Sequence, residues 1–165
     1  MKPLEITPWL REMNRLLLEN DSLYRDAARR LGVPECTLWI LYTIRADGQP
    51  ITQAQLCQIL REPKTTVNSA LKHMAAQGYI VLTAGEDRRT RSVVLTEKGM
   101  ELAKSTADQL LHAEEAAIFG LSLEQREGLL REMRRFNKEL AKQLNQLGVN
   151  KTTTKEAIRH ENSTF

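Results

Sequence analysis

Long apolar runs are missing from this sequence, and no stretch approaches the ~20 apolar residues that a membrane-spanning helix needs. The first five residues have no apolar core, so we expect no secretory signal there. Aromatic residues make up only 5%, and the two cysteines, Cys36 and Cys57, are too few for a disulfide framework. We therefore expect a cytoplasmic protein without a membrane partner.

Motifs for catalysis and metal binding are also missing. His73, His112 and His160 are widely spaced, and neither His-x-x-x-His nor Cys-x-x-Cys occurs. There is no phosphate-binding glycine loop and no Gly-x-Ser-x-Gly elbow. The sequence predicts a protein that is not an enzyme and needs no cofactor or metal.

The charge distribution points to an anionic partner. The chain has 165 residues, enough for one domain or one domain with an appendage, and a net charge of +3. Residues 45–99 hold eight Lys and Arg against five Asp and Glu, so the whole excess lies in this third of the chain. Such an excess favours an anionic partner only when it coincides with a binding motif.

A basic β-hairpin supplies part of that motif. Two β-prone runs, residues 79–83 and 92–95, flank a turn that contains Asp87, Arg88, Arg89 and Arg91. An arginine in a hairpin tip can enter a narrow minor groove or contact phosphates. Asp87 is expected to orient a neighbouring guanidinium. The alternative is an exposed charged turn without a partner.

Two short helices precede the hairpin. Thr52 to Gln55 forms a capping box that opens a helix, for which we expect a buried stripe of Leu56, Ile59 and Leu60. After the turn 61–63, the next helix begins near Pro63. Its periodicity places Val67, Ala70, Leu71 and Met74 inward, and this leaves outward the polar residues Lys64, Thr65, Thr66, Asn68, Ser69, Lys72 and His73.

The fold class predicted from these elements is mainly α with a small β-hairpin wing. Residues 35–96 would form a winged helix-turn-helix DNA-binding domain, preceded by a long helix over about 9–31. It is followed by a helix over 96–119 that Thr96 caps, and by a helix over 122–147 that a second capping box, Ser122 to Gln125, opens. These three helices carry more apolar face than the small domain can cover, so we expect residues 1–34 and 97–147 to form a dimerisation region. An intramolecular bundle is the alternative. Residues 148–165 are expected to form a polar, mobile tail.

The motif Asp87-x-Arg89-x-x-x-Val93-x-Leu95-Thr96-x-x-Gly99 resembles that of the MarR family of bacterial transcriptional regulators. The resemblance extends over about residues 8–147. It implies a homodimer that binds a pseudo-palindromic operator in double-stranded DNA, mostly as a repressor. It assigns a minor-groove role to Arg89, with Asp87 as its orienting partner, and makes Thr65, Thr66 and Asn68 groove readers. Many members carry arginine where this chain has Ser69, and leucine where it has Met74.

The resemblance also implies a small aromatic or phenolic effector. Trp9, Met13, Trp39, Tyr42 and His112 are candidates to line its cleft, although such residues at helical spacing are more often plain core. Cys36 and Cys57 are expected to be buried, inert thiols, because Glu35 next to Cys36 would raise the thiol pKa. A different class of function remains open, in which the winged helix binds proteins and does not recognise a DNA sequence.

Overall fold

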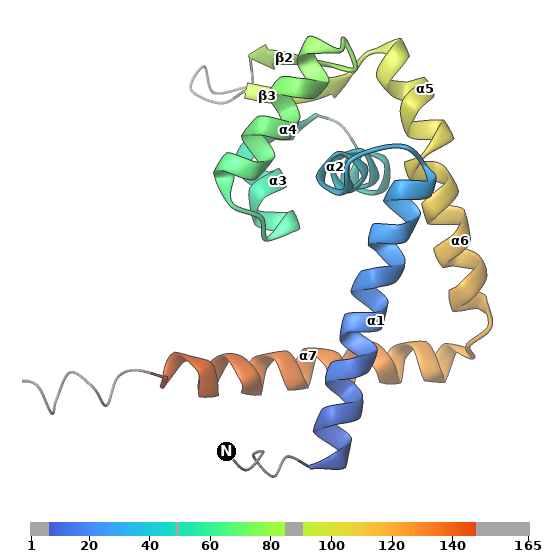
Figure 1. Ribbon diagram of the computed structural model, residues 1–165, viewed down its shortest axis with the longest axis vertical. Helices are drawn as coiled ribbons and strands as arrows, with labels where there is room; N and C mark the ends of the chain where they lie inside the picture. Colours follow the sequence, from blue (N-terminus) through green and yellow to red (C-terminus); the bar gives the residue numbers. More distant parts are fainter. Residues whose placement is uncertain (1–6, 49, 85–90, 148–165) are drawn as a thin grey trace, which may run out of the picture. The chain divides into compact units, whose positions relative to one another are not determined.

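The protein is mainly helical, as the computed structural model shows (Figure 1). The structure describes residues 7–48, 50–84 and 91–147. Its helices and strands are α1 (Pro8–Arg30), α2 (Glu35–Asp47), β1 (Ile51–Thr52), α3 (Gln53–Leu60), α4 (Lys64–Ala76), β2 (Ile80–Ala84), β3 (Arg91–Leu95), α5 (Glu97–Ser105), α6 (Ala107–Phe119) and α7 (Leu123–Asn145). The chain separates into two compact units, residues 1–115 and residues 116–165. The predicted fold class is confirmed.

Side-chain caps define where the helices start. Thr52 accepts a hydrogen bond from the backbone amide of Gln55, whose side chain in turn accepts from the Thr52 amide, and Ser122 and Gln125 form the same reciprocal box. Both capping boxes were predicted from the sequence and are confirmed. Thr96 caps α5 by accepting from the Gly99 amide at 3.0 Å, also as predicted.

A three-stranded antiparallel sheet joins the hairpin to the helix-turn-helix. The strand order is β1-β3-β2, with Ile51 opposite Val93 and Ile80 opposite Leu95. Strand β1 was not predicted. Thr52 pairs with Ser92 of β3 and also caps α3. This residue therefore fixes the start of α3 relative to the hairpin.

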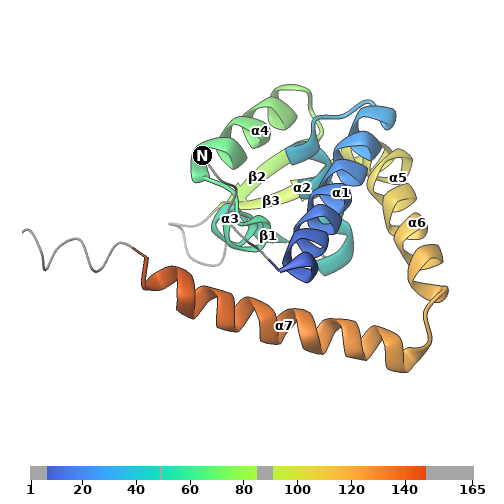
Figure 2. The same ribbon diagram turned by 60° about the horizontal axis from the view of Figure 1, so that its bottom comes forward.

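The core of the first unit surrounds α2, which contacts α1, α3, α4 and α5 (Figure 2). Its buried apolar residues are Leu38, Ile40, Leu41 and Ile44, so apolar side chains occupy several faces of the helix, as expected of a central helix. The expected stripe of α3 is wrong in part. Leu56 is fully buried and Leu60 is half-buried, but Ile59 is 48% exposed.

The helix predicted over residues 96–119 is two helices, and Thr106 separates α5 from α6. Its backbone leaves the helical region at φ −130° and ψ −79°. The Thr106 hydroxyl donates to the Leu102 carbonyl at 2.6 Å, and the residue is 2% exposed. A threonine hydroxyl that bonds the carbonyl four residues earlier offers the backbone an alternative to the helix ladder and often bends it.

Helix α7 and the residues before it belong to the second unit. Arg126 lies over the Phe119 ring, 4.9 Å from its centroid, and donates to the Leu121 carbonyl at 2.8 Å. None of the α7 residues is buried, and Leu129, Leu130 and Leu144 are each more than half exposed. Among the described residues, no helix combines the length and apolar character that spanning a membrane requires.

Candidate nucleic-acid interface

Helix α4 presents a continuous polar face to solvent. Val67, Leu71 and Met74 are buried in the core, which fixes the rotation of the helix about its axis. The opposite face holds the exposed side chains of Lys64, Thr65, Thr66, Ser69 and Lys72, with Asn68 half-buried at its border. Of the seven polar α4 residues predicted to lie outward, these six share one surface, and His73 is also exposed.

Most of these polar groups have no partner within the described part of the chain. The exception is Ser69, whose hydroxyl donates to the Thr65 carbonyl at 2.9 Å. Ser69 therefore offers only its acceptor lone pairs to an external ligand, as long as this bond is kept. The hydroxyls of Thr65 and Thr66 and the amide of Asn68 can both donate and accept.

The turn before α4 aims the start of the helix outward. Arg61 adopts the left-handed conformation, with φ 56° and ψ 23°, and Pro63 precedes the first helical residue without a side-chain cap. The first amides of a helix have no intrahelical partner, so the α4 start carries partial positive charge. An exposed helix start with uncapped amides suits a phosphate group.

The hairpin wing is described up to its tip. Ala84 opposite Arg91 is the outermost described pair, and Arg91 is exposed there. Asp87, Arg88 and Arg89 fall in the connection 85–90, which lies outside the described residues, as does the segment 148–165.

A close backbone contact ties the end of α4 to the start of α5. Thr96 donates from its amide to the Tyr79 carbonyl at 3.0 Å and from its hydroxyl to the Gly78 carbonyl at 2.7 Å. Lys98 donates to the Gln77 carbonyl at 2.8 Å and lies 4.7 Å from the centroid of the Tyr79 ring. Sequence reasoning did not find this junction, although Thr96 and Gly99 stand in the motif quoted above.

A second tie joins α2 to α6. Arg45 Nε lies 2.6 Å from Asp108 Oδ1 and Arg45 Nη2 lies 2.8 Å from Asp108 Oδ2, which is a bidentate pair. Hydrogen bonding to the Arg45 guanidinium lowers the pKa of Asp108 below its usual value. Arg45 therefore fixes the end of α2 to the helix that follows the break at Thr106.

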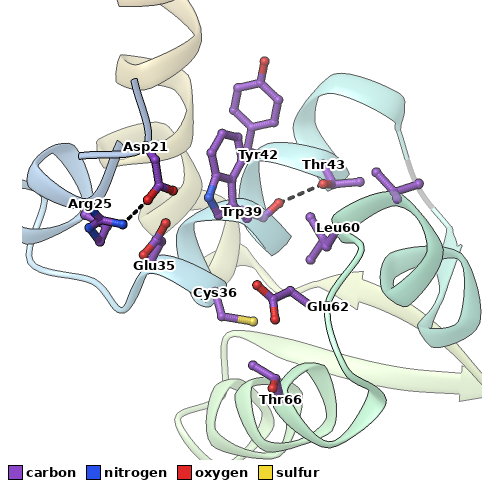
Figure 3. A pocket seen from close by; sticks show the side chains of 11 residues that line it. Asp21, Arg25, Glu35, Cys36, Trp39, Tyr42, Thr43, Leu60, Glu62 and Thr66 are labelled. Atoms are coloured by element: carbon purple, nitrogen blue, oxygen red, sulfur yellow. Dashed lines mark hydrogen bonds and ion pairs between the residues drawn. The ribbon is translucent and has the colours of Figure 1, made fainter. Parts of the chain in front are cut away.

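A cavity of about 690 Å³ lies between α1, α2, α3 and the start of α4 (Figure 3). Of the five residues proposed for an effector cleft, Trp39 and Tyr42 line it, whereas Trp9, Met13 and His112 do not. Trp9 is 66% exposed and His112 is exposed. The sequence missed the charged residues of the lining, which come from three separate elements.

The two cysteines are half-buried, and Cys36 lines the cavity. Burial raises the pKa of the Cys36 thiol, and the charge of Glu62, then Cys57 and Glu35, raises it further. The expected direction is therefore confirmed, with burial and not Glu35 as the main cause. Within the described ranges, no group of three or more His, Cys, Asp or Glu side chains could hold a metal ion.

A helix-turn-helix followed by an antiparallel hairpin defines a winged helix-turn-helix protein. Residues 31–90 match the family model described as the MarR family. The match covers 60 of the 165 residues, and in this part the chain is similar to the MarR family.

One curated relative is similar in sequence, and two solved structures share the fold. An uncharacterized HTH-type transcriptional regulator of Bacillus subtilis, YwoH, is 28% identical over 97 residues, which are 59% of this chain and 70% of the relative. The structure of a MarR family regulator from Neisseria meningitidis has a TM-score of 0.75 at 20% identity and covers 85% of this chain and 99% of its own. A candidate MarR family regulator from Listeria monocytogenes, solved with 26mer DNA, has a TM-score of 0.63 at 21% identity, covering 87% and 92%.

Proposed function

We propose that this protein binds duplex DNA sequence-specifically, as a homodimer at a pseudo-palindromic operator, and represses transcription. The observation that carries the proposal is the polar face of α4, which is held rigidly by Val67, Leu71 and Met74 beside an arginine-containing hairpin. The Listeria monocytogenes relative, which was solved in complex with DNA, has the same fold. In a bacterial cell, this function would place the protein in the cytoplasm.

The roles of the side chains follow from their chemistry. Lys64, Thr65, Thr66, Asn68 and Ser69 would face the major groove, where an asparagine can bind adenine in a bidentate manner and hydroxyls can serve several base edges. Lys72, one turn further along α4, would contact a phosphate. In the wing, Arg88, Arg89 and Arg91 would contact the minor groove or its phosphates, and Asp87 would orient Arg89.

Uncovered apolar surface supports a homodimer. In α1, Leu16, Leu18 and Leu23 are between 53% and 69% exposed. In the second unit, α7 has large apolar side chains but no buried residue. Helices with such faces usually bury them against another chain, and a two-fold symmetric pair is the commonest arrangement. We infer that residues 1–34 and 97–147 form this interface and that 35–96 reads DNA.

A small-molecule effector would act through the cavity beside α4. Its lining includes Glu62 in the turn before α4 and Thr66 on the first turn of that helix. A ligand in this cavity would contact α4 directly through Thr66, so its binding would be coupled to the position of α4. We infer that such a ligand releases the protein from its operator.

The competing function is a winged helix that binds another protein. It is favoured by one observation, namely that Val81 and Leu82 on β2 are 47% and 43% exposed, which puts apolar surface on the wing. Selection from random duplex DNA with the purified protein, near physiological salt, separates the two. Enrichment of an inverted repeat supports the regulator. Folded, dimeric protein that enriches no sequence would support the protein-binding module.

A further inference from the structure

The cavity beside α4 carries an excess of negative charge. Three carboxylates, Asp21, Glu35 and Glu62, line it against one guanidinium, that of Arg25. Arg25 is already ion-paired with Asp21, as the dashed line in Figure 3 shows. Glu35 and Glu62 have no hydrogen-bond or ion-pair partner among the described residues. The cavity therefore has two unneutralised carboxylates and no uncommitted lining cation.

An anion inside the cavity is disfavoured, because Glu35 and Glu62 line it without a lining cation to neutralise them. The Cys36 thiolate would be an anion between Glu35 and Glu62 (Figure 3), and burial, followed by the charges of these carboxylates, raises the pKa of the thiol. The same burial and the same two charges would act on a bound phenolate or carboxylate. The anionic form of a phenolic effector therefore suits this cavity poorly.

The remaining walls are suited to an apolar or aromatic body. Trp39 and Tyr42 lie edge to face, with ring centroids 5.3 Å apart, and Leu60 and Ile59 add aliphatic surface. The Thr43 hydroxyl is already used, because it donates to the Trp39 carbonyl at 2.8 Å. Indole and phenol rings attract cations through their faces. Aromatic walls beside carboxylates without partners therefore suit an organic cation.

From this lining we infer that the cavity binds an aromatic or amphipathic organic cation, with its charge near Glu62 and Glu35 and its apolar part against Trp39. The inference deepens the proposed effector response, and only its regulatory consequence rests on that response. Binding itself can be measured on the dimer without DNA. A protein that fails to bind DNA would therefore leave this test intact.

The experiment compares two probes of opposite charge and similar shape. Phenyltrimethylammonium and benzenesulfonate each carry a tetrahedral charged group on one phenyl ring, and neither titrates near neutral pH. Trp9→Phe leaves Trp39 as the sole tryptophan, so its emission reports this cavity. We expect saturable binding of the cation in both Trp39 emission and titration calorimetry, with benzenesulfonate at least about tenfold weaker.

Carboxylate variants locate the charge. Glu62→Gln and Glu35→Gln should each weaken binding of the cation by about fivefold, whereas Glu101→Gln, an exposed carboxylate on α5 outside the cavity, should not change it. Thermal unfolding checks that each variant is folded. If the anion binds as tightly as the cation, if the cation does not bind, or if both cavity variants retain full affinity, the inference is overturned.

Discussion

A Cβ atom at position 99 would lie 1.8 Å from the Tyr79 carbonyl oxygen, so only glycine fits where α5 meets the chain leaving α4. The contact is between backbones and cannot be relieved by rotating a side chain. It holds the start of α5 against the segment that connects α4 to β2.

Gly99→Ala should therefore destabilise the fold by about 3 kcal/mol or more, since the backbones must separate. Denaturant unfolding of the purified variant measures the change. Gly128→Ala in α7 is the matched control, because its Cβ would meet only the flexible Arg131 side chain at 3.6 Å. Alanine there should leave stability unchanged or raise it slightly. Equal effects at the two positions would contradict the close contact.

The Arg45–Asp108 pair predicts a pH dependence. Asp108→Asn should cost about 1 kcal/mol at pH 7, since the bidentate pair is partly buried. The pKa of Asp108 is lowered in the folded protein. The contribution of the Asp108 carboxylate to folding stability is therefore full above the ordinary aspartate pKa, and it is lost as pH falls through the lowered pKa. The stability difference between wild type and variant should therefore shrink below about pH 4.

Urea unfolding at several pH values measures this difference. Asp26→Asn is the control, because the Asp26–Arg29 pair has exposed side chains and should contribute no measurable stability. A wild-type advantage that stays constant down to pH 3 would show that Asp108 acts through packing and not through its charge.

Arg61 predicts a gain in stability from a glycine. The left-handed conformation of Arg61 costs a non-glycine residue roughly 1 kcal/mol. Arg61→Gly should therefore be more stable than Arg61→Ala by about that amount, and this comparison removes the arginine side chain from both variants. Thermal unfolding of the two proteins provides the measurement. If alanine proved at least as stable, the turn would not be strained.

Tyr24 predicts a second pH effect, of opposite sign. Its hydroxyl donates to Glu114 Oε1 at 2.6 Å, and burial, followed by this bond, raises the pKa of Tyr24 to about 12. The contribution of protonated Tyr24 to folding stability is therefore full below the ordinary tyrosine pKa. It is lost as pH rises through the pKa of about 12 that Tyr24 has in the folded protein. Tyr24→Phe should cost about 1 kcal/mol at neutral pH.

The tyrosinate absorbance difference between wild type and Tyr24→Phe gives the pKa of Tyr24 directly. Glu114→Gln tests the order of causes, since it removes the charge but leaves the residue buried. The pKa of Tyr24 should then fall only in part, because burial is the larger cause. Complete return to the ordinary value would make the Glu114 charge the dominant cause instead.

Local and periodic features of this fold could be predicted from the sequence, whereas distant contacts could not. The inward positions of α4 and the two capping boxes depend on residues three or four apart, and both predictions are confirmed. Strand β1 has two residues and exists only because β3 lies beside it. The Arg45–Asp108 pair, whose members are 63 residues apart, likewise depends on tertiary packing.

The candidate effector cleft shows the same limit. Helical spacing identified Trp39 and Tyr42 as residues of an apolar face, but it treated Trp9 and Met13 in the same way. Which of these faces adjoins a cavity depends on how α1, α2 and α3 pack. The carboxylates that give the cavity its charge, Glu35 and Glu62, fall in no periodic pattern.

The DNA-binding proposal predicts different effects for the wing and for α4. Arg89→Ala should weaken binding to the selected operator by about 1–3 kcal/mol while leaving thermal unfolding unchanged. Lys72→Ala, on the exposed face of α4, should weaken operator and random DNA alike and reduce the slope of log affinity against log salt by about 1.

Fluorescence anisotropy with labelled operator and scrambled duplexes, at several salt concentrations, separates these two effects. Lys104→Ala on α5 is the control, because it removes one exposed positive charge outside the residues proposed to contact DNA and should change neither the affinity for DNA nor the salt slope. If Lys104→Ala matched Lys72→Ala, the attraction would come from net charge and not from the α4 face. If Arg89→Ala bound the operator like wild type, the wing would not contribute to recognition, and the groove-reading role would fall to α4 alone.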